Sequence, residues 1–195
     1  LYDKFPNQLL PFDFDTYFRY ADGFEMVTTN CQTGRTMYLT ENQDRQRALD
    51  VVKASSSLPF VSKIVTVDGI PMLDGGIVDS IPVIHSMETG HSINVLVLTR
   101  NKGFRSSEKD HKIPHFVYKK YPRLRVALSR RIVAYNEQLD LIDKLEASGQ
   151  VICIRPEKVL DVGRMEKDTQ KLEALYEEGY RLGDAFCRNF PNHIL

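Results

Sequence analysis

The sequence predicts an α/β fold in which a mostly parallel central sheet lies between layers of helices, and two patterns favour it. Residues 93–99 form a nearly continuous apolar run, which is typical of a parallel strand covered on both faces. After Asp74, a predicted helix leads into that strand, as in the crossovers of layered α/β sheets. With 195 residues, of which 42% are apolar, the chain has enough apolar side chains for a core.

The first forty residues predict an aromatic segment followed by a pair of strands. Residues 1–22 are rich in aromatic residues and proline, and we expect a loop and a short helix packed on the rest of the chain. Residues 24–30 and 36–40 alternate as strands do, and Gly34 suits the turn between them.

A helix and a hairpin follow. Asn42 predicts the cap of a helix that reaches about Ala54, and the segment 55–59, with three serines and a proline, ends it. Asp68-Gly69 between apolar runs is a strong hairpin signal, because glycine takes the positive φ that such a turn needs. The second strand of this hairpin ends at Asp74.

The second half of the chain is mostly helical. In chain order we expect a helix over residues 82–89, a polar loop over 100–114, a helical pattern over about 115–148, a strand over 150–155 and a helix over about 168–189. Pro122 marks the start of the long helix and Gly149 marks its end. One apolar face marks the long helix: Leu124, Leu128, Ile132, Tyr135, Leu139 and Ile142. No repeat or linker interrupts the pattern, so a single domain over residues 1–195 is predicted.

Asp74 is the candidate catalytic residue. It stands at the end of a predicted strand and before two glycines, where open α/β sheets place their chemistry. Gly75 and Gly76 carry no Cβ, so another backbone or a substrate can approach closely. The competing interpretation is a turn or capping aspartate, since Asp and Gly are common turn residues. Asp79 or Ser80 is expected to cap the next helix.

The order of these blocks resembles a known family. Ser55-Ser56-Ser57-Leu58-Pro59, then Asp74-Gly75-Gly76, then Asp79-Ser80-Ile81-Pro82 are similar to the second conserved block of the patatin-like phospholipases. Residues 27–35 look like the strand and turn ahead of that block, and residues 98–105 are similar to a bacterial branch. The resemblance covers about residues 24–100. It implies a three-layer sandwich and the hydrolysis of lipid acyl esters by a serine–aspartate dyad, with Asp74 as the aspartate.

The other half of that dyad is missing. The family's serine lies in a Gly-x-Ser-x-Gly segment, and the nearest match, Gly90-His91-Ser92-Ile93-Asn94, lacks the second glycine and follows Asp74. Because the sequence also begins with Leu1, we expect it to be the carboxy-terminal part of a longer hydrolase, incomplete at its amino-terminal side. Alone, it should be inactive, since a base without a nucleophile or oxyanion hole has nothing to activate.

Two other functions stay open. One is a catalytically inactive lipid-binding or interaction module with the same fold, and the other is acyl transfer to a different acceptor. An in-frame Gly-x-Ser-x-Gly segment upstream of Leu1 would favour the enzyme, and a start codon at that point would favour the module.

Composition limits the classes of binding partner and the cellular environment that we expect. The formal net charge is zero, which gives the whole molecule no electrostatic bias toward nucleic acid. Three widely spaced cysteines favour reduced thiols in the cytoplasm, and no apolar run is long enough to span a membrane. His111 and His115 are four residues apart but have no third ligand, so we expect no metal and no cofactor.

A run of positive charge suggests contact with a membrane surface. Between His111 and Asn136 there is no acidic residue but there are seven basic ones. The candidate patch would bind anionic lipid headgroups and consists of Lys119, Lys120, Arg123 and Arg125. The alternative is a solvated helix face balanced by the acids of the last helix.

Overall fold

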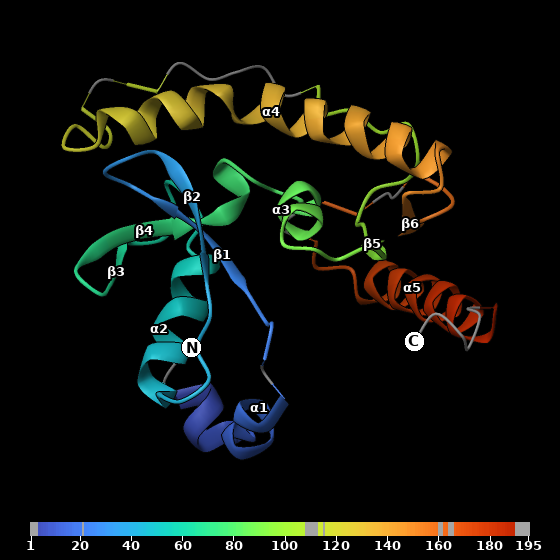
Figure 1. Cartoon of the computed structure of the whole chain (residues 1–195), viewed down its shortest axis with the longest axis horizontal. Helices are drawn as coiled ribbons and strands as arrows, with labels where there is room; N and C mark the ends of the chain where they lie inside the picture. The colour runs from blue at the N-terminus through green and yellow to red at the C-terminus, as the bar shows by residue number, and fades with distance from the viewer. Residues whose placement is uncertain are drawn as a thin grey trace. The chain divides into compact units, whose positions relative to one another are not determined.

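The computed structural model describes residues 4–20, 22–107, 113–114, 116–159, 162–163 and 166–189. Contacts within the chain group it into two compact units, which we treat separately (Figure 1). The first unit combines Leu1–Pro82 with Ser107–Asn136, and the second combines Val83–Ser106 with Glu137–Leu195. The longest helix, α4 (Pro122–Ala147), contributes residues to both.

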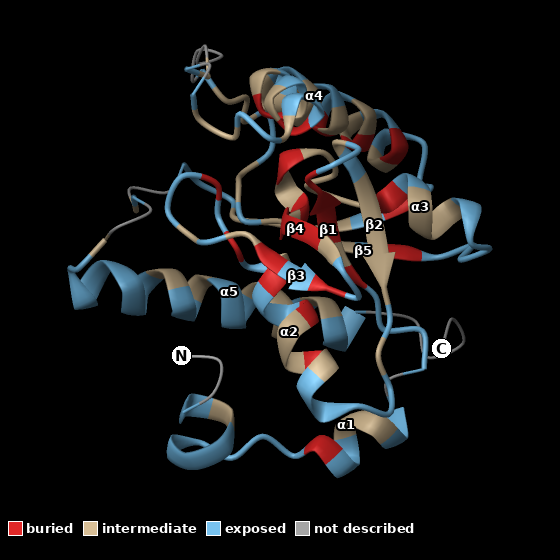
Figure 2. Cartoon of the chain, turned by 90° about the vertical axis from the view of Figure 1, so that its left-hand side faces the viewer, coloured by how far each residue is buried: buried red, intermediate tan, exposed pale blue. Residues whose placement is uncertain are grey.

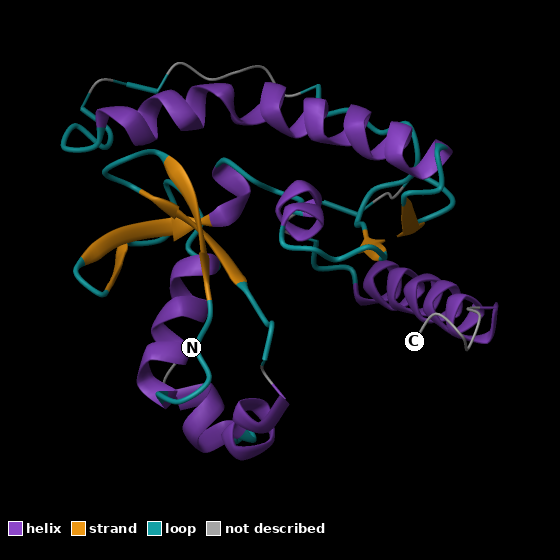
Figure 3. Ribbon diagram, viewed as in Figure 1, coloured by secondary structure: helices purple, strands orange, loops and turns teal. Residues whose placement is uncertain are grey.

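The first unit is built on a four-stranded sheet in which every neighbouring pair is antiparallel (Figure 3). In spatial order its strands are β2 (Arg35–Leu39), β1 (Met26–Asn30), β4 (Ile70–Asp74) and β3 (Val65–Val67). Both predicted hairpins are confirmed. Asp68 and Gly69 have φ values of 51° and 76°, so both central residues take the positive φ of a tight hairpin turn.

The predicted mostly parallel central sheet is therefore wrong, and with it the patatin-like three-layer sandwich as the fold of this chain. Among the described residues the one parallel pair is β5 (Asn94–Val97) with β6 (Val151–Ile154), in a separate two-stranded sheet. The physical reason lies in the connections: a two-residue turn joins β3 to β4, and so short a turn can join only antiparallel strands. Asp74 ends a strand of this antiparallel sheet, so the argument from parallel-sheet edges does not apply to it.

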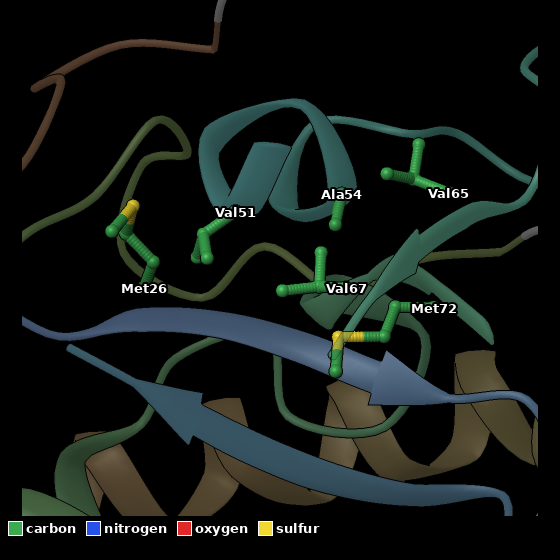
Figure 4. Close-up of a cluster of buried hydrophobic side chains, with 6 residues drawn as sticks. All are labelled: Met26, Val51, Ala54, Val65, Val67 and Met72. Carbon is green, nitrogen blue, oxygen red and sulfur yellow. The ribbon is translucent and has the colours of Figure 1, made fainter. Parts of the chain in front are cut away.

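Helices cover both faces of the first unit's sheet. Met72 and Leu73 are neighbours on β4 and fully buried, but their side chains point to opposite faces because strand residues alternate. On the Met72 side, α2 (Arg45–Ser55) supplies the partners (Figure 4). The cluster there consists of Met26, Val51, Ala54, Val65, Val67 and Met72.

On the Leu73 side the covering element is the first part of α4. Leu124 and Leu128 of this helix pack with Leu73, Ile77 and Cys31. Figure 2 shows buried residues along β1 and β4 and on α2 and α4. The turn after β1 lies close to the start of α4, since a Cβ at Gly34 would come within 2.6 Å of the Arg123 carbonyl oxygen. The predicted apolar face of the long helix is confirmed at this end.

An ion-pair network fixes the start of α2. The helix cap is Asp44, two residues beyond the predicted Asn42, and its carboxylate accepts a hydrogen bond from the Arg47 backbone N–H. The Arg47 side chain lies 2.7 Å from Glu41 and 2.8 Å from Asp68 of the hairpin turn. Hydrogen bonds from the Asp44 and Gln43 backbone N–H groups, together with this guanidinium, lower the pKa of Glu41 to about 2.

Replacing Glu41 with Gln is expected to destabilise the protein by about 2 kcal/mol at pH 7. The pKa of Glu41 in the fold lies below its ordinary value of 4.5, so the charge stabilises the fold fully above that value and loses this effect as the pH falls toward 2. Urea unfolding at pH 7 and at acid pH tests this. The difference in free energy of unfolding between wild type and Glu41→Gln should shrink as the pH falls. A difference that does not change with pH would contradict this explanation.

The second unit contains α3 (Val83–Glu88), β5, the remainder of α4, β6 and α5 (Thr169–Asn189). Arg155, which follows β6, pairs with Asp143 and Glu146 of α4, and Arg105 pairs with Asp143 and Asp140. The predicted strand over residues 93–99 is shorter and less covered than expected, since Val97 is 76% exposed. The predicted last helix is confirmed.

Candidate functional site

Hydrogen bonds from two other parts of the first unit hold the Asp74 backbone in place. Its N–H donates to the Ser57 carbonyl oxygen at 2.9 Å, which ties the end of β4 to the segment after α2. Its carbonyl oxygen accepts a 2.9 Å hydrogen bond from the Thr29 hydroxyl of β1. The strand end is thus fixed from both sides before the chain turns.

The Asp74 side chain has one oxygen engaged and one open. Oδ1 accepts a 2.6 Å hydrogen bond from the Gly76 N–H, so Asp74 caps the short 3₁₀ helix η2 (Gly75–Ile77). This is the capping role that competes with catalysis. Among the described residues no hydrogen bond reaches Oδ2, and the residue is half-buried. Because a carboxylate has two oxygens, the capping role leaves Oδ2 able to accept a proton.

The two glycines serve different purposes. A Cβ on Gly75 would lie 2.6 Å from the Val27 carbonyl oxygen, so the backbone that approaches closely is the chain's own β1. A Cβ on Gly76 would meet the Asp74 Oδ1 at 2.9 Å and the Ser80 hydroxyl at 3.7 Å, both side-chain atoms. Gly76 is therefore the glycine whose substitution would shift the Asp74 carboxylate.

Two residues beyond the predicted site hold the loop that follows. The Gly76 carbonyl oxygen accepts hydrogen bonds from Arg131 Nε at 2.9 Å and from the Ser80 hydroxyl at 3.0 Å. Tyr38 donates its hydroxyl to Asp79 Oδ2 at 2.5 Å. Sequence reasoning missed Tyr38 and Arg131. Helical spacing offered one signal, since Arg131 follows Leu124 and Leu128 on the inward face of α4.

The candidate basic patch is divided. Lys119, Lys120 and Arg123 are exposed, as a surface patch requires. Arg125 is half-buried: its guanidinium donates to the Ile113 carbonyl oxygen at 3.0 Å, and its Nε is buried without a hydrogen-bond partner in the described part of the chain. Arg125 thus holds the preceding segment, and His111 and His115 lie outside the described residues.

An apolar pocket lies at the other end of α2. It has a volume of about 780 Å³ and is lined by aromatic residues of the amino-terminal segment and by one face of the helix. The segment includes η1 (Phe5–Leu9) and α1 (Phe14–Tyr20). Here the expectation of an aromatic segment packed on the rest of the chain needs qualification, because Phe14 is buried whereas Phe12 and Tyr20 are mostly exposed. The pocket does not include Asp74.

Two further findings concern the environment of the chain. No helix in the described ranges is long and apolar enough to cross a membrane. All three cysteines are free, and burial raises the pKa of the Cys31 thiol to about 12. At neutral pH Cys31 is therefore a thiol and behaves as a small buried apolar residue.

Comparison with protein families finds a match in the second half of the chain. Residues 121–194 match a family model described as a domain of unknown function, DUF6363. The matched stretch includes α4, β6 and α5 and covers less than half of the chain. No curated protein matches the sequence. The matched stretch does not include Asp74, so it does not test the prediction that this residue is catalytic.

Proposed function

We propose that this chain supplies the general base of a lipid acyl ester hydrolase, and that the base is Asp74. The observation that carries the proposal is the divided role of its carboxylate: Oδ1 is held by the Gly76 N–H, while Oδ2 has no hydrogen bond from the described residues. A base held in one orientation with one free oxygen suits proton transfer from an incoming hydroxyl. The resemblance to patatin-like phospholipases names that hydroxyl as a serine.

The proposed reaction proceeds in two halves. As the serine oxygen attacks the ester carbonyl carbon, Asp74 Oδ2 takes the hydroxyl proton and a tetrahedral intermediate forms. When the intermediate collapses, the carbon–oxygen bond to the alcohol breaks and the alcohol leaves with the proton from Asp74. Water then attacks the acyl-serine, again giving its proton to Asp74, and the fatty acid is released as the serine is reprotonated.

The serine comes from outside these residues in this proposal, because the 195 residues contain no Gly-x-Ser-x-Gly segment. The test is ester hydrolysis by the protein translated from the complete reading frame that encodes this chain. That protein should hydrolyse p-nitrophenyl butyrate, and residues 1–195 alone should not, since they lack a nucleophile. Turnover by residues 1–195 alone would contradict the proposal.

A lipid-binding module is the second candidate, and the apolar pocket favours it. Its volume of about 780 Å³ lies within the range of small-molecule sites, and its aromatic and aliphatic lining suits an acyl chain. This candidate predicts that the complete protein binds a fluorescent fatty acid but hydrolyses no ester. Ester hydrolysis by the complete protein would support the hydrolase and contradict the lipid-binding module.

The place we propose for this activity is the cytoplasmic side of a membrane, at its surface. The free cysteines support a reducing compartment. A lipid substrate supports a peripheral position, since such substrates reside in bilayers.

A further inference from the structure

Two loops of the first unit expose large apolar side chains next to one another. One is the segment after α2, residues 58–63, in which Val61 is 82% exposed and Phe60 59%. The other is the segment before α4, residues 116–121, in which Phe116 is 69% exposed. Single exposed apolar residues are common, but a group on joined loops is typical of a binding surface.

The two loops are joined by a direct contact. The Phe60 N–H donates to the Tyr118 hydroxyl oxygen at 2.8 Å, and the two rings lie 5.7 Å apart. Phe60 and Tyr118 have φ values of 68° and 52°, a conformation that bulky side chains rarely adopt. Tyr118 also packs against the core cluster around Leu73 and Leu124. The contact therefore holds both loops in a fixed, strained shape while their apolar side chains face solvent.

The charged residues within these loops, and next to them in sequence, are all basic. Residues 51–67 contain no Asp or Glu, and neither do residues 111–136. Lys63 lies in the first loop, Lys119 and Lys120 lie in the second, and all three are exposed. Exposed apolar residues flanked by lysines have the chemistry of a surface that enters the interface of an anionic bilayer, where lysine ammonium groups meet lipid phosphates.

We propose that the loop pair, defined as residues 58–63 and 116–121, docks on an anionic phospholipid bilayer. Val61, Phe60 and Phe116 enter the interface, and Lys63, Lys119 and Lys120 contact the headgroups. This surface differs from the predicted patch, because Arg123 and Arg125 lie outside it and residues 58–63 belong to it.

The loop pair adjoins the candidate site. Ser57, whose carbonyl oxygen accepts the Asp74 N–H, immediately precedes the first loop. The Asp74 backbone is thus tied directly to the residue before this loop. The inference deepens the proposed function and takes from it the lipid substrate, but bilayer docking is measured without turnover.

The test is binding of the full chain to vesicles of equal parts phosphatidylcholine and phosphatidylglycerol at low salt. Val61→Ser combined with Phe116→Ser should weaken binding by at least about tenfold, because two interfacial anchors are lost. Lys119→Gln and Lys120→Gln should each weaken it by about fivefold. Matched controls lie in the second unit: Val159→Ser, whose side chain is 78% exposed, and Lys158→Gln should leave binding unchanged.

Tryptophan fluorescence provides a second test, which reports whether the loop itself enters the bilayer. The chain contains no tryptophan, so Val61→Trp introduces a single reporter. Its emission should move to shorter wavelength with anionic vesicles, whereas Val159→Trp should not respond. Absence of the shift, or binding that the serine pair leaves unchanged, would overturn the proposal. Asp74→Asn should bind vesicles as wild type does, so a failure of the hydrolase proposal stays distinguishable.

Discussion

Asp74→Asn is expected to lower kcat/KM for p-nitrophenyl butyrate at least about a hundredfold in the protein from the complete reading frame. Asparagine has nearly the shape of aspartate, and its carbonyl oxygen still accepts the Gly76 N–H, so the turn should persist. The amide cannot take up the serine proton, so the variant does not stabilise the transition state of the proton transfer.

Asp68→Asn is the matched control for this variant. Asp68 is also an aspartate of the first unit, but it occupies the hairpin turn and pairs with Arg47. Its replacement should remove an exposed ion pair and leave kcat/KM unchanged within about twofold. If both variants lose activity alike, the cause is general destabilisation, and if neither loses activity, Asp74 is a structural cap.

Gly75→Ala is expected to destabilise the first unit by about 3 kcal/mol or more. The added Cβ would lie 2.6 Å from the Val27 carbonyl oxygen and 2.7 Å from its carbonyl carbon. Both are backbone atoms of β1, which is hydrogen-bonded to β2 on one side and β4 on the other. The Val27 oxygen also accepts a 2.8 Å hydrogen bond from the Ser55 hydroxyl, so the strand has little room to move.

Gly76→Ala separates stability from activity. Its Cβ would meet side-chain atoms, chiefly the Asp74 Oδ1, and the carboxylate can rotate away. We expect this variant to unfold at a urea concentration close to wild type but to lose ester hydrolysis, because the base is displaced. Urea unfolding of both alanine variants measures the contrast. Equal stability losses would contradict the assignment of close backbone packing to Gly75.

The hairpins and helix ends could be predicted because their signals are local. Asp68-Gly69 and Gly34 take positive φ in the structure, as their turns require. Pro122 begins α4, where its missing N–H costs no hydrogen bond. The arrangement of strands could not be predicted in this way. An apolar run such as residues 93–99 does not show whether other elements cover the strand. Which strands pair with one another depends on contacts between residues far apart in sequence.

The same distinction applies to the site. The sequence placed Asp74 at the end of a strand, and the structure confirms that position. The contacts of Arg131 with Gly76 and of Tyr38 with Asp79 join residues about forty or more positions apart, and no local pattern marks them. Val61 resembles a core residue in the sequence. Its exposure follows from the shape of a loop that the Phe60–Tyr118 contact fixes.

Mass spectrometry of the complete protein after treatment with a fluorophosphonate ester tests the central claim most directly. Such reagents phosphonylate a serine that a neighbouring base has activated. We predict one adduct, on the serine of a Gly-x-Ser-x-Gly segment, which Asp68→Asn retains and Asp74→Asn loses. An adduct that forms equally fast in Asp74→Asn, or the absence of any adduct on wild type, would contradict the role of Asp74 as the base.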